Sequence, residues 1–382
     1  MITKLKIKGF KRFHEVTFDD LSRINIFIGI NNVGKTTALE GLMGLASGSS
    51  HYAVLNVAVY NRIPVQGLTA YQLADLMLQA FHDAKSASDL SFTFNGVIDG
   101  EEKCFSHTLE PGQLIDSLLV GTQNIVDGSE VMHRQMPVPF PLSPGGSIMM
   151  DVPSQYLGKW TIKSDEYSLS HEISYPISFQ QLPNKKICKL AIHHNLFTFS
   201  NEMSIGQVYS SLKRSKHWSK FIEELNVSFP ELKIKNIENI PYPDGTVAPI
   251  SIQFENGSRH PLYTLGNGFR RWYEVVGQMI AYPNAIHCID EADATFHYQA
   301  QNGFATNLYQ CAEKYDNQVF MATHNMEYLK NIIEALEKDS TEIIKNNFRV
   351  ITLRNYHEDI RVRIIDGEEA LRAIQQGLEL RI

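Results

Sequence analysis

The 382-residue sequence predicts an α/β protein built around a mostly parallel β-sheet, and three observations lead to that fold class. Nearly continuous apolar runs, typical of strands buried on both faces, occur at 24–30, 284–290 and 317–324. In the last third of the chain such runs alternate with segments of helical spacing. Asp99-Gly100 and Asn256-Gly257 each separate two strand-like segments and indicate hairpins. We therefore expect an antiparallel β subdomain beside the parallel sheet, and a small helical insertion.

The expected elements follow in chain order. Strands at 2–8 and 24–30 open the chain, helices follow at 36–47 and 69–84, and a hairpin occupies 91–110. A long loop is expected at 120–158, which is rich in Pro, Gly, Ser and Met. The later elements are strand-like residues at 159–179, a helical segment at 205–225, a hairpin at 249–265, helices at 268–281, 297–314 and 326–338, strands at 284–290, 317–324, 348–355 and 360–366, and a helix from Glu368. This order suggests an N-terminal lobe at 1–115, an insertion at 116–245 and a C-terminal lobe at 246–382.

The composition is that of a folded protein, with 43% hydrophobic and 20% charged residues. No segment approaches the roughly 18 uninterrupted apolar residues of a membrane span, and the first residues lack the apolar block of a signal peptide. We therefore expect a cytoplasmic protein with no membrane partner. The net charge of -7 argues against a protein that coats nucleic acid by itself. The four cysteines form no CxxC pair, so neither a zinc site nor a disulfide framework is expected.

A glycine-rich turn, GINNVGKTT, follows the strand at 24–30. It fits the Gly-x4-Gly-Lys-Thr pattern of a P-loop, with a strand before it and a helix after it. Backbone N–H groups of such a turn bind the β- and γ-phosphates, the lysine adds positive charge, and the threonine hydroxyl ligates Mg²⁺. The nucleotide-binding residues expected here are Gly29, Asn31, Asn32, Gly34, Lys35, Thr36 and Thr37, and Lys35 also has a catalytic role.

Two later strands end in polar residues suited to the same chemistry. The strand at 284–290 leads into Asp290 and Glu291, and the strand at 317–324 ends in His324. Because the carboxyl ends of parallel strands meet at one edge of a sheet, these side chains should lie near the P-loop. Asp290 is then a Mg²⁺ ligand with Thr36, while Glu291 polarises the attacking water and His324 binds the γ-phosphate. The chain lacks an Asn-Lys-x-Asp guanine box, which favours ATP as the nucleotide.

The series IKGFKRF, GINNVGKTT, LGNGFRR, IDEADATFH and MATHN, in this order, resembles the ABC-type ATPases of the SMC/RecF/OLD superfamily. It is most similar to the stand-alone, AAA15-like members of that group. The resemblance implies a P-loop NTPase with an ABC-ATPase-like head that forms a homodimer, or a higher oligomer, around ATP. The signature of one copy, here Gly266, Asn267 and Gly268, would cap the γ-phosphate held by the P-loop of another. Asn267 replaces the usual serine.

The same resemblance assigns further positions. Lys11 and Arg12 fall where relatives carry a basic residue near the α-phosphate or the base, with a solvated surface pair as the alternative. Residues 294–297 occupy the loop that would cross the dimer interface. Arg270 and Arg271 could reach a phosphate or carboxylate across that interface, and at least one of them is expected to be solvent-exposed. A glutamine loop is expected too, but several glutamines compete for that place and none is assigned.

These features describe an ATPase head with no effector module. A long coiled coil, a zinc hook and a Toprim nuclease domain are not expected, and HHN at 193–195 lacks a metal-ligand pattern, which indicates a structural role. We therefore predict a slowly hydrolysing ATP switch that controls a separate effector, such as a nuclease or toxin, as in bacterial anti-phage systems. Two alternatives stay open: a RecF-like repair ATPase that binds DNA, and a scaffold that binds ATP but scarcely hydrolyses it.

Overall fold

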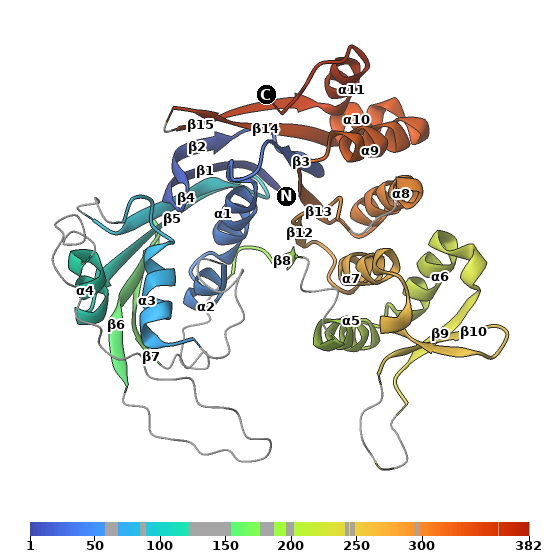
Figure 1. Cartoon of the computed structure of the whole chain (residues 1–382), viewed down its shortest axis with the longest axis horizontal. Helices are drawn as coiled ribbons and strands as arrows, with labels where there is room; N and C mark the ends of the chain where they lie inside the picture. Colours follow the sequence, from blue (N-terminus) through green and yellow to red (C-terminus); the bar gives the residue numbers. More distant parts are fainter. Residues whose placement is uncertain are drawn as a thin grey trace.

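The computed structural model describes residues 1–57, 68–84, 89–121, 154–175, 187–195, 202–240, 244, 249–294, 298–357 and 359–381. Within this part of the chain the strands form two six-stranded sheets and one three-stranded sheet. In Figure 1 the antiparallel sheet stands on the left, the parallel sheet runs through the middle, and the C-terminal helices lie on the right. No helix among the described residues is long and apolar enough to cross a lipid bilayer.

The parallel sheet carries the ends of the predicted motif strands. Its order is β15 (Asp359–Asp366), β14 (Phe348–Tyr356), β3 (Ile24–Ile28), β13 (Gln318–Thr323), β12 (Ile286–Ile289) and β8 (Ala191–His194). Neighbouring strands are parallel from β14 to β8, and β15 pairs antiparallel with β14. Every residue of β3, β12 and β13 is buried, which explains their continuous apolar runs. The mostly parallel sheet predicted from the sequence is confirmed.

The second six-stranded sheet is antiparallel throughout and confirms the predicted β subdomain. Its order is β2 (Phe13–Phe18), β1 (Ile2–Phe10), β4 (Ser91–Ile98), β5 (Glu101–Pro111), β6 (Gln155–Lys163) and β7 (Ser168–Tyr175). Three helices accompany this sheet: α2 (His51–Leu55), α3 (Ala70–Leu78) and α4 (Gln113–Gly121). An isolated bridge between Phe10 and Phe81 ties the segment after α3 to the end of β1.

Helix α1 (Lys35–Ser47) packs between the two large sheets, and nearly all of its residues are buried. A Cβ atom at Gly41 would lie 2.2 Å from Ile7 Cδ1, and one at Gly44 would lie 2.4 Å from the Phe94 ring. Only glycine allows the helix to approach the antiparallel sheet this closely. The close packing holds the first turn of α1 beside the carboxyl edge of the parallel sheet.

The opposite side of the parallel sheet has its own apolar core. It is covered by α7 (Asn267–Ala281), α8 (Tyr298–Lys314), α9 (Met326–Asp339), α10 (Thr341–Asn346) and α11 (Gly367–Gln375). Beyond α7 lie α5 (Glu202–Arg214), α6 (Trp218–Ser228), two 3-10 turns (Pro230–Leu232 and Leu262–Thr264) and a small sheet of β9 (Ile234–Glu238), β10 (Ser251–Phe254) and β11 (Arg259–Pro261).

The structure refines several expectations. The single helical segment at 205–225 is two helices, because Lys216 has a φ of 60° and breaks the helical path before α6. Most of the loop expected at 120–158 lies outside the described residues, but its end, from Gln155, belongs to β6. Residues 116–245 contribute β6 and β7 to the antiparallel sheet and β8 to the parallel sheet, so this region forms part of both sheets.

Candidate nucleotide-binding site

The glycine-rich turn at 29–34 joins the end of β3 to the start of α1. Gly29 and Gly34 have φ angles of 152° and 103°, which side-chain-bearing residues rarely adopt. A Cβ atom would also lie 2.6 Å from the Leu353 carbonyl oxygen at Gly29 and 2.8 Å from the Phe13 ring at Gly34. Gly34 supplies no side-chain cap to α1, and the first turn of the helix holds no acidic residue. The helix therefore presents its N–H groups and the positive end of its dipole to an anion.

Lys35 folds back over this turn. Its Nζ atom donates to the carbonyl oxygens of Gly29 and Ile30, each at 2.8 Å. Burial lowers the pKa of the Lys35 ammonium, while the carboxylates of Asp290 and Asp293 oppose that shift. An ammonium group has three N–H donors, so this arrangement accommodates a phosphate oxygen as a third acceptor.

Thr36 and Asp290 form the pair expected of a magnesium site. The Thr36 hydroxyl donates to Asp290 Oδ2 at 2.8 Å, although the two residues are 254 positions apart in the sequence. Among the described residues there is no cluster of three or more His, Cys, Asp or Glu side chains that could hold a metal ion unaided. Mg²⁺ suits a smaller donor set, because it prefers oxygen ligands and usually retains water and phosphate oxygens beside one or two protein groups. The hydroxyl and carboxylate therefore fit Mg²⁺ bound together with a nucleotide.

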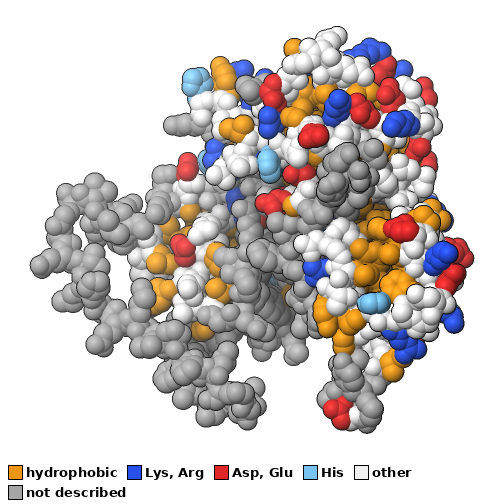
Figure 2. Space-filling model, turned by 45° about the vertical axis from the view of Figure 1, so that its right-hand side comes forward, with side chains coloured by type: hydrophobic (Ala, Val, Ile, Leu, Met, Phe, Trp, Pro, Cys, Tyr) orange, Lys and Arg blue, Asp and Glu red, His pale blue; other side chains and the backbone are white. Residues whose placement is uncertain are grey.

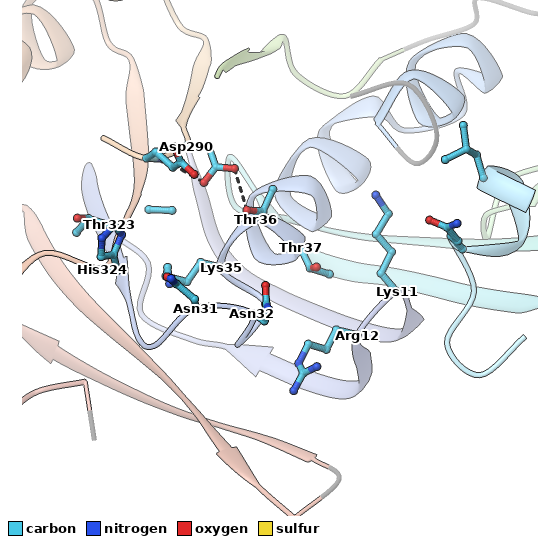
Figure 3. Close-up of a pocket in the computed structure, with 15 residues that line it drawn as sticks. Lys11, Arg12, Asn31, Asn32, Lys35, Thr36, Thr37, Asp290, Thr323 and His324 are labelled. Carbon is cyan, nitrogen blue, oxygen red and sulfur yellow. Dashed lines mark hydrogen bonds between the residues drawn. The ribbon is translucent and has the colours of Figure 1, made fainter. Parts of the chain in front are cut away.

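Glu291 and His324 lie on the same cavity, which has a volume of about 840 Å³. Glu291 is exposed and follows β12 with a φ of 48°, and its N–H donates to Asp290 Oδ1 at 3.1 Å. The Thr323 hydroxyl donates to Asp293 Oδ1 at 2.6 Å, and the His324 carbonyl accepts from Arg381 Nη1 at 3.0 Å. Figure 3 shows Lys35, Thr36, Asp290 and His324 around one space. The predicted residues that line the cavity are Lys11, Arg12, Asn31, Asn32, Gly34, Lys35, Thr36, Thr37, Asp290, Glu291 and His324.

Lys11 and Arg12 occupy the end of this cavity away from His324 (Figure 3). Lys11 Nζ lies 2.9 Å from Glu40 Oε1, and the Glu40 side chain is fully buried. Arg12 Nη2 donates to Asn355 Oδ1 at 2.9 Å. The Lys11 side chain is only 14% exposed, so the alternative of a solvated surface pair is wrong for this residue.

Leu76 and Gln79 also line the cavity, although no sequence pattern selects them. They reach it because Lys11 N–H donates to the Ala80 carbonyl at 3.0 Å and His82 N–H donates to the Gly9 carbonyl at 2.9 Å. These bonds hold the end of α3 against the turn after β1. No residue was assigned to the glutamine loop, and among the described glutamines Gln79 lines the cavity.

The signature residues lie elsewhere. Gly266, Asn267 and Gly268 do not line the cavity, and Gly266 and Asn267 are exposed at the start of α7. A Cβ atom at Gly266 would have no atom of the described residues within 4 Å. Asn267 Oδ1 accepts a hydrogen bond from Arg270 Nη2. Of the expected interface loop at 294–297, only Ala294 is among the described residues.

Arg271 corrects an expectation. Instead of reaching outward, its side chain is fully buried and donates to three backbone carbonyls at the ends of β8 and β12. Arg270 is half-buried rather than exposed. The helical phase explains the difference, since Arg271 falls on the face of α7 that packs on the sheet. His194, from the HHN stretch, is buried in the same region and bonds to Glu274 and His287.

Two known proteins are similar to this chain in sequence. The chain is 21% identical over 391 residues to an ATP/GTP phosphatase from Helicobacter pylori, an alignment that covers 97% of this chain and 100% of that one. A shorter stretch is 39% identical over 56 residues to the DNA replication and repair protein RecF of Flavobacterium johnsoniae, covering 15% and 16% of the two chains. No protein-family model matches the sequence.

A solved structure covers the same extent. The SMC head in its complex with the C-terminal winged-helix domain of ScpA superposes with a TM-score of 0.51 and 11% identity, over 97% of this chain and 99% of that one. At this identity the likeness concerns the fold alone, which resembles that of the SMC head. It confirms the α/β architecture expected from the motif series.

Proposed function

We propose that this chain, an ABC-type ATPase head of the SMC/RecF kind, binds and hydrolyses ATP and acts as a nucleotide-driven dimer switch. The observation that carries the proposal is the cavity lined by Lys35, Thr36, Asp290, Glu291 and His324. It supports a phosphate and magnesium site on one chain. The signature turn lies outside that cavity and is exposed, with no described atom close to Gly266, which suits it to a site on a second copy.

Each residue at the sheet edge has a role in this proposal. The turn at 29–34 and Lys35 bind the phosphates, and Thr36 with Asp290 holds Mg²⁺, which supplies positive charge to the phosphate oxygens when bound. Glu291 accepts a hydrogen bond from the attacking water and aligns it. His324 donates to the γ-phosphate from the end of β13.

A second copy would complete the site. Gly266 is the N-cap of α7 and, like Gly34 on α1, offers no side-chain cap, so the α7 N–H groups remain suited to an anion. Asn267 Oδ1 already accepts from Arg270, which leaves the amide NH₂ as the group directed to other acceptors. Asn267 can therefore donate to a phosphate, as the serine it replaces would.

The decisive test is Glu291→Gln with ATP and Mg²⁺. This change removes the base that aligns the water and leaves the Thr36 and Asp290 ligands in place. We expect ATP to double the mass measured by size-exclusion light scattering, while turnover falls. The matched control, Lys35→Ala combined with Glu291→Gln, should stay at the mass of the nucleotide-free protein. A Glu291→Gln variant whose mass ignores ATP would contradict the dimer switch.

For the biological role, we propose that dimer closure controls a separate effector protein, such as a nuclease or toxin of anti-phage defence. The SMC head aligns with 97% of this chain, which supports reading the described elements as the head itself. A head of this kind could act on a separate protein by changing its shape or assembly state when it binds ATP. Affinity purification with and without ATP, together with phage plating on cells that carry Glu291→Gln, tests this role. If Glu291→Gln left phage plating unchanged and no protein co-purified in an ATP-dependent way, the proposed role in controlling an effector would be contradicted.

A RecF-like DNA-binding ATPase is the second candidate, favoured by the 56-residue similarity to RecF. The net charge of -7 weighs against it, and acidic side chains are interspersed with the basic ones on the face seen in Figure 2. It predicts ATP-dependent DNA affinity that falls steeply as salt rises. Fluorescence anisotropy with labelled duplex DNA at two salt concentrations would decide between the candidates.

A further inference from the structure

A cluster of ionisable side chains lies buried where α7 crosses the ends of β8 and β12. Arg271 and Glu274 come from α7, His194 from β8 and His287 from β12. All four are 0% exposed. Burying charged and polar groups is costly unless they are paired, so the cluster calls for an explanation beyond packing.

Arg271 is the centre of the cluster. Its Nη1 atom donates to the Asn195 carbonyl at 2.7 Å, and its Nη2 atom donates to the His194 carbonyl at 3.2 Å and the Asp290 carbonyl at 3.0 Å. Nη1 also lies 3.7 Å from Glu274 Oε2. A planar guanidinium can hold several carbonyls in fixed relative positions, which a lysine ammonium does less well. Arg271 thus holds the end of β8, at His194 and Asn195, and the backbone of Asp290 together.

A second row of contacts also holds α7 against β8 and β12. Glu274 Oε1 lies 2.7 Å from His194 Nδ1, and His194 Nε2 lies 3.0 Å from His287 Nδ1. Asp290 N–H donates to the His194 carbonyl at 2.9 Å. Burial, reinforced by the neighbouring His194, lowers the pKa of His287 well below its ordinary value and so favours the neutral form of this ring. A row of buried polar contacts with fixed partners resists sliding of α7 against β12.

We propose that Arg271 is a positioning residue that links the signature turn to the magnesium-binding strand of the same chain. The inference rests on the proposed dimer. In that dimer the signature of one chain serves one ATP site, while its own Asp290 and Glu291 serve the other. Arg271 lies four residues after Asn267 on α7 and bonds to the Asp290 backbone, so it joins the two sites through one chain. A movement of α7 on capping the γ-phosphate then moves Asp290 in the second site.

The alternative is that Arg271 only supports its own surroundings. It could serve the signature helix alone, or hold the end of β12 alone, without joining them. Spatial connection by itself does not demonstrate coupling between sites. The two sites must therefore be tested separately, in dimers where only one of them hydrolyses ATP.

The experiment uses mixed dimers of full-length chains with two different affinity tags. One subunit keeps Glu291 and the other carries Glu291→Gln, so both bind ATP but only the first hydrolyses it. Arg271→Lys is then placed either in the hydrolysing subunit or in the subunit that lends its signature. Arg271→Met with Glu274→Gln is the second variant, because it removes both charges and keeps an acceptor for His194. Thermal melting verifies that each variant folds.

We expect turnover per dimer to fall about fivefold or more in either placement, with nucleotide affinity unchanged. Arg349→Lys is the matched control, since Arg349 also donates to backbone carbonyls, those of Lys345 and Phe348, from β14. It should leave turnover unchanged. A loss in one placement only, or in neither, overturns the link. If the mixed dimer without Arg271 changes does not form with ATP, the proposed dimer switch fails instead.

Discussion

Helices α1 and α7 both begin at glycine-rich turns, without a side-chain cap or an acidic residue in the first turn, yet their surroundings differ. The start of α1 faces Asp290, Glu291 and His324 across a cavity, whereas the start of α7 faces solvent. In the function proposed above, the same local chemistry would therefore serve a cation and phosphate site at the start of α1 and half of such a site at the start of α7. Under the proposed dimer switch, this difference means that one chain would bind the nucleotide and a second copy would enclose it.

The largest effect should come from the α1 side. Lys35→Ala removes the only ammonium that bonds to the 29–34 turn in the structure as described. We expect affinity for ATP to fall roughly 100-fold or more, because a charge-assisted contact to the phosphates is lost. Isothermal titration with ATP and Mg²⁺ measures the change. ATP bound with undiminished affinity by a folded Lys35→Ala variant would contradict the site.

A smaller effect, on turnover and on the Mg²⁺ concentration that it requires, should follow from Asp290→Asn. The amide keeps the shape of the side chain but removes the charge that would face Mg²⁺ in the proposed site. We expect kcat to fall on the order of 100-fold and the Mg²⁺ concentration needed for half-maximal turnover to rise. A phosphate-release assay across a magnesium series checks this. Asp359→Asn, on the exposed end of β15, is the control and should leave both quantities unchanged.

The α7 side should respond differently. Asn267→Asp puts a negative charge where a phosphate of the second copy would lie and removes the amide donor. We expect ATP binding by the single chain to be unchanged, while turnover falls about tenfold and the ATP-dependent dimer is weakened. Asn267→Ser, which keeps a donor, should retain the dimer. If Asn267→Asp and Lys35→Ala lowered the ATP affinity of the single chain equally, the proposal that α7 serves the ATP site of a second copy would be contradicted.

The residues around the start of α1 can be selected from the sequence because each of them lies in a recognisable local pattern. Gly29 and Gly34 are required by backbone angles and by close neighbours, and the strands that deliver Asp290 and His324 are continuous apolar runs. The rule that parallel strands end at one edge then brings these distant segments together. The Thr36–Asp290 hydrogen bond is the contact that this reasoning anticipates.

The sequence does not predict Gln79 or the inward turn of Arg271. Gln79 reaches the cavity through backbone bonds between the end of α3 and the turn after β1, and these depend on tertiary packing. Arg271 is adjacent to Arg270, and charge alone favours exposure for both. Its burial depends on three carbonyls from separate segments, which have no sequence pattern of their own. Buried polar networks of this kind are visible only when the partners are placed in space.

A buried histidine in the antiparallel sheet, remote from the starts of α1 and α7, should make the folding stability depend on pH. His107, on β5, is fully buried against Phe92 and Trp160, and burial lowers its pKa to about 3. In the unfolded chain a histidine titrates near its ordinary value, about 6.5. The unfolded state therefore binds the extra proton between these values, and stability falls as pH drops from about 6.5 toward 3. At pH 5 this group should account for a loss of roughly 2 kcal/mol relative to neutral pH.

His107→Asn tests this effect, because the amide oxygen retains an acceptor for Trp160 Nε1 and no longer titrates. We expect urea unfolding to show a lower stability for the variant at pH 7 and a shallower decline between pH 7 and pH 5 than in the unaltered protein. His357→Asn, at an exposed turn, should reproduce the unaltered decline. Identical slopes for His107→Asn and His357→Asn would show that the buried ring is not the origin. At neutral pH neither variant should alter ATP affinity or ATP-dependent dimer formation, since His107 and His357 both lie outside the cavity and the signature turn.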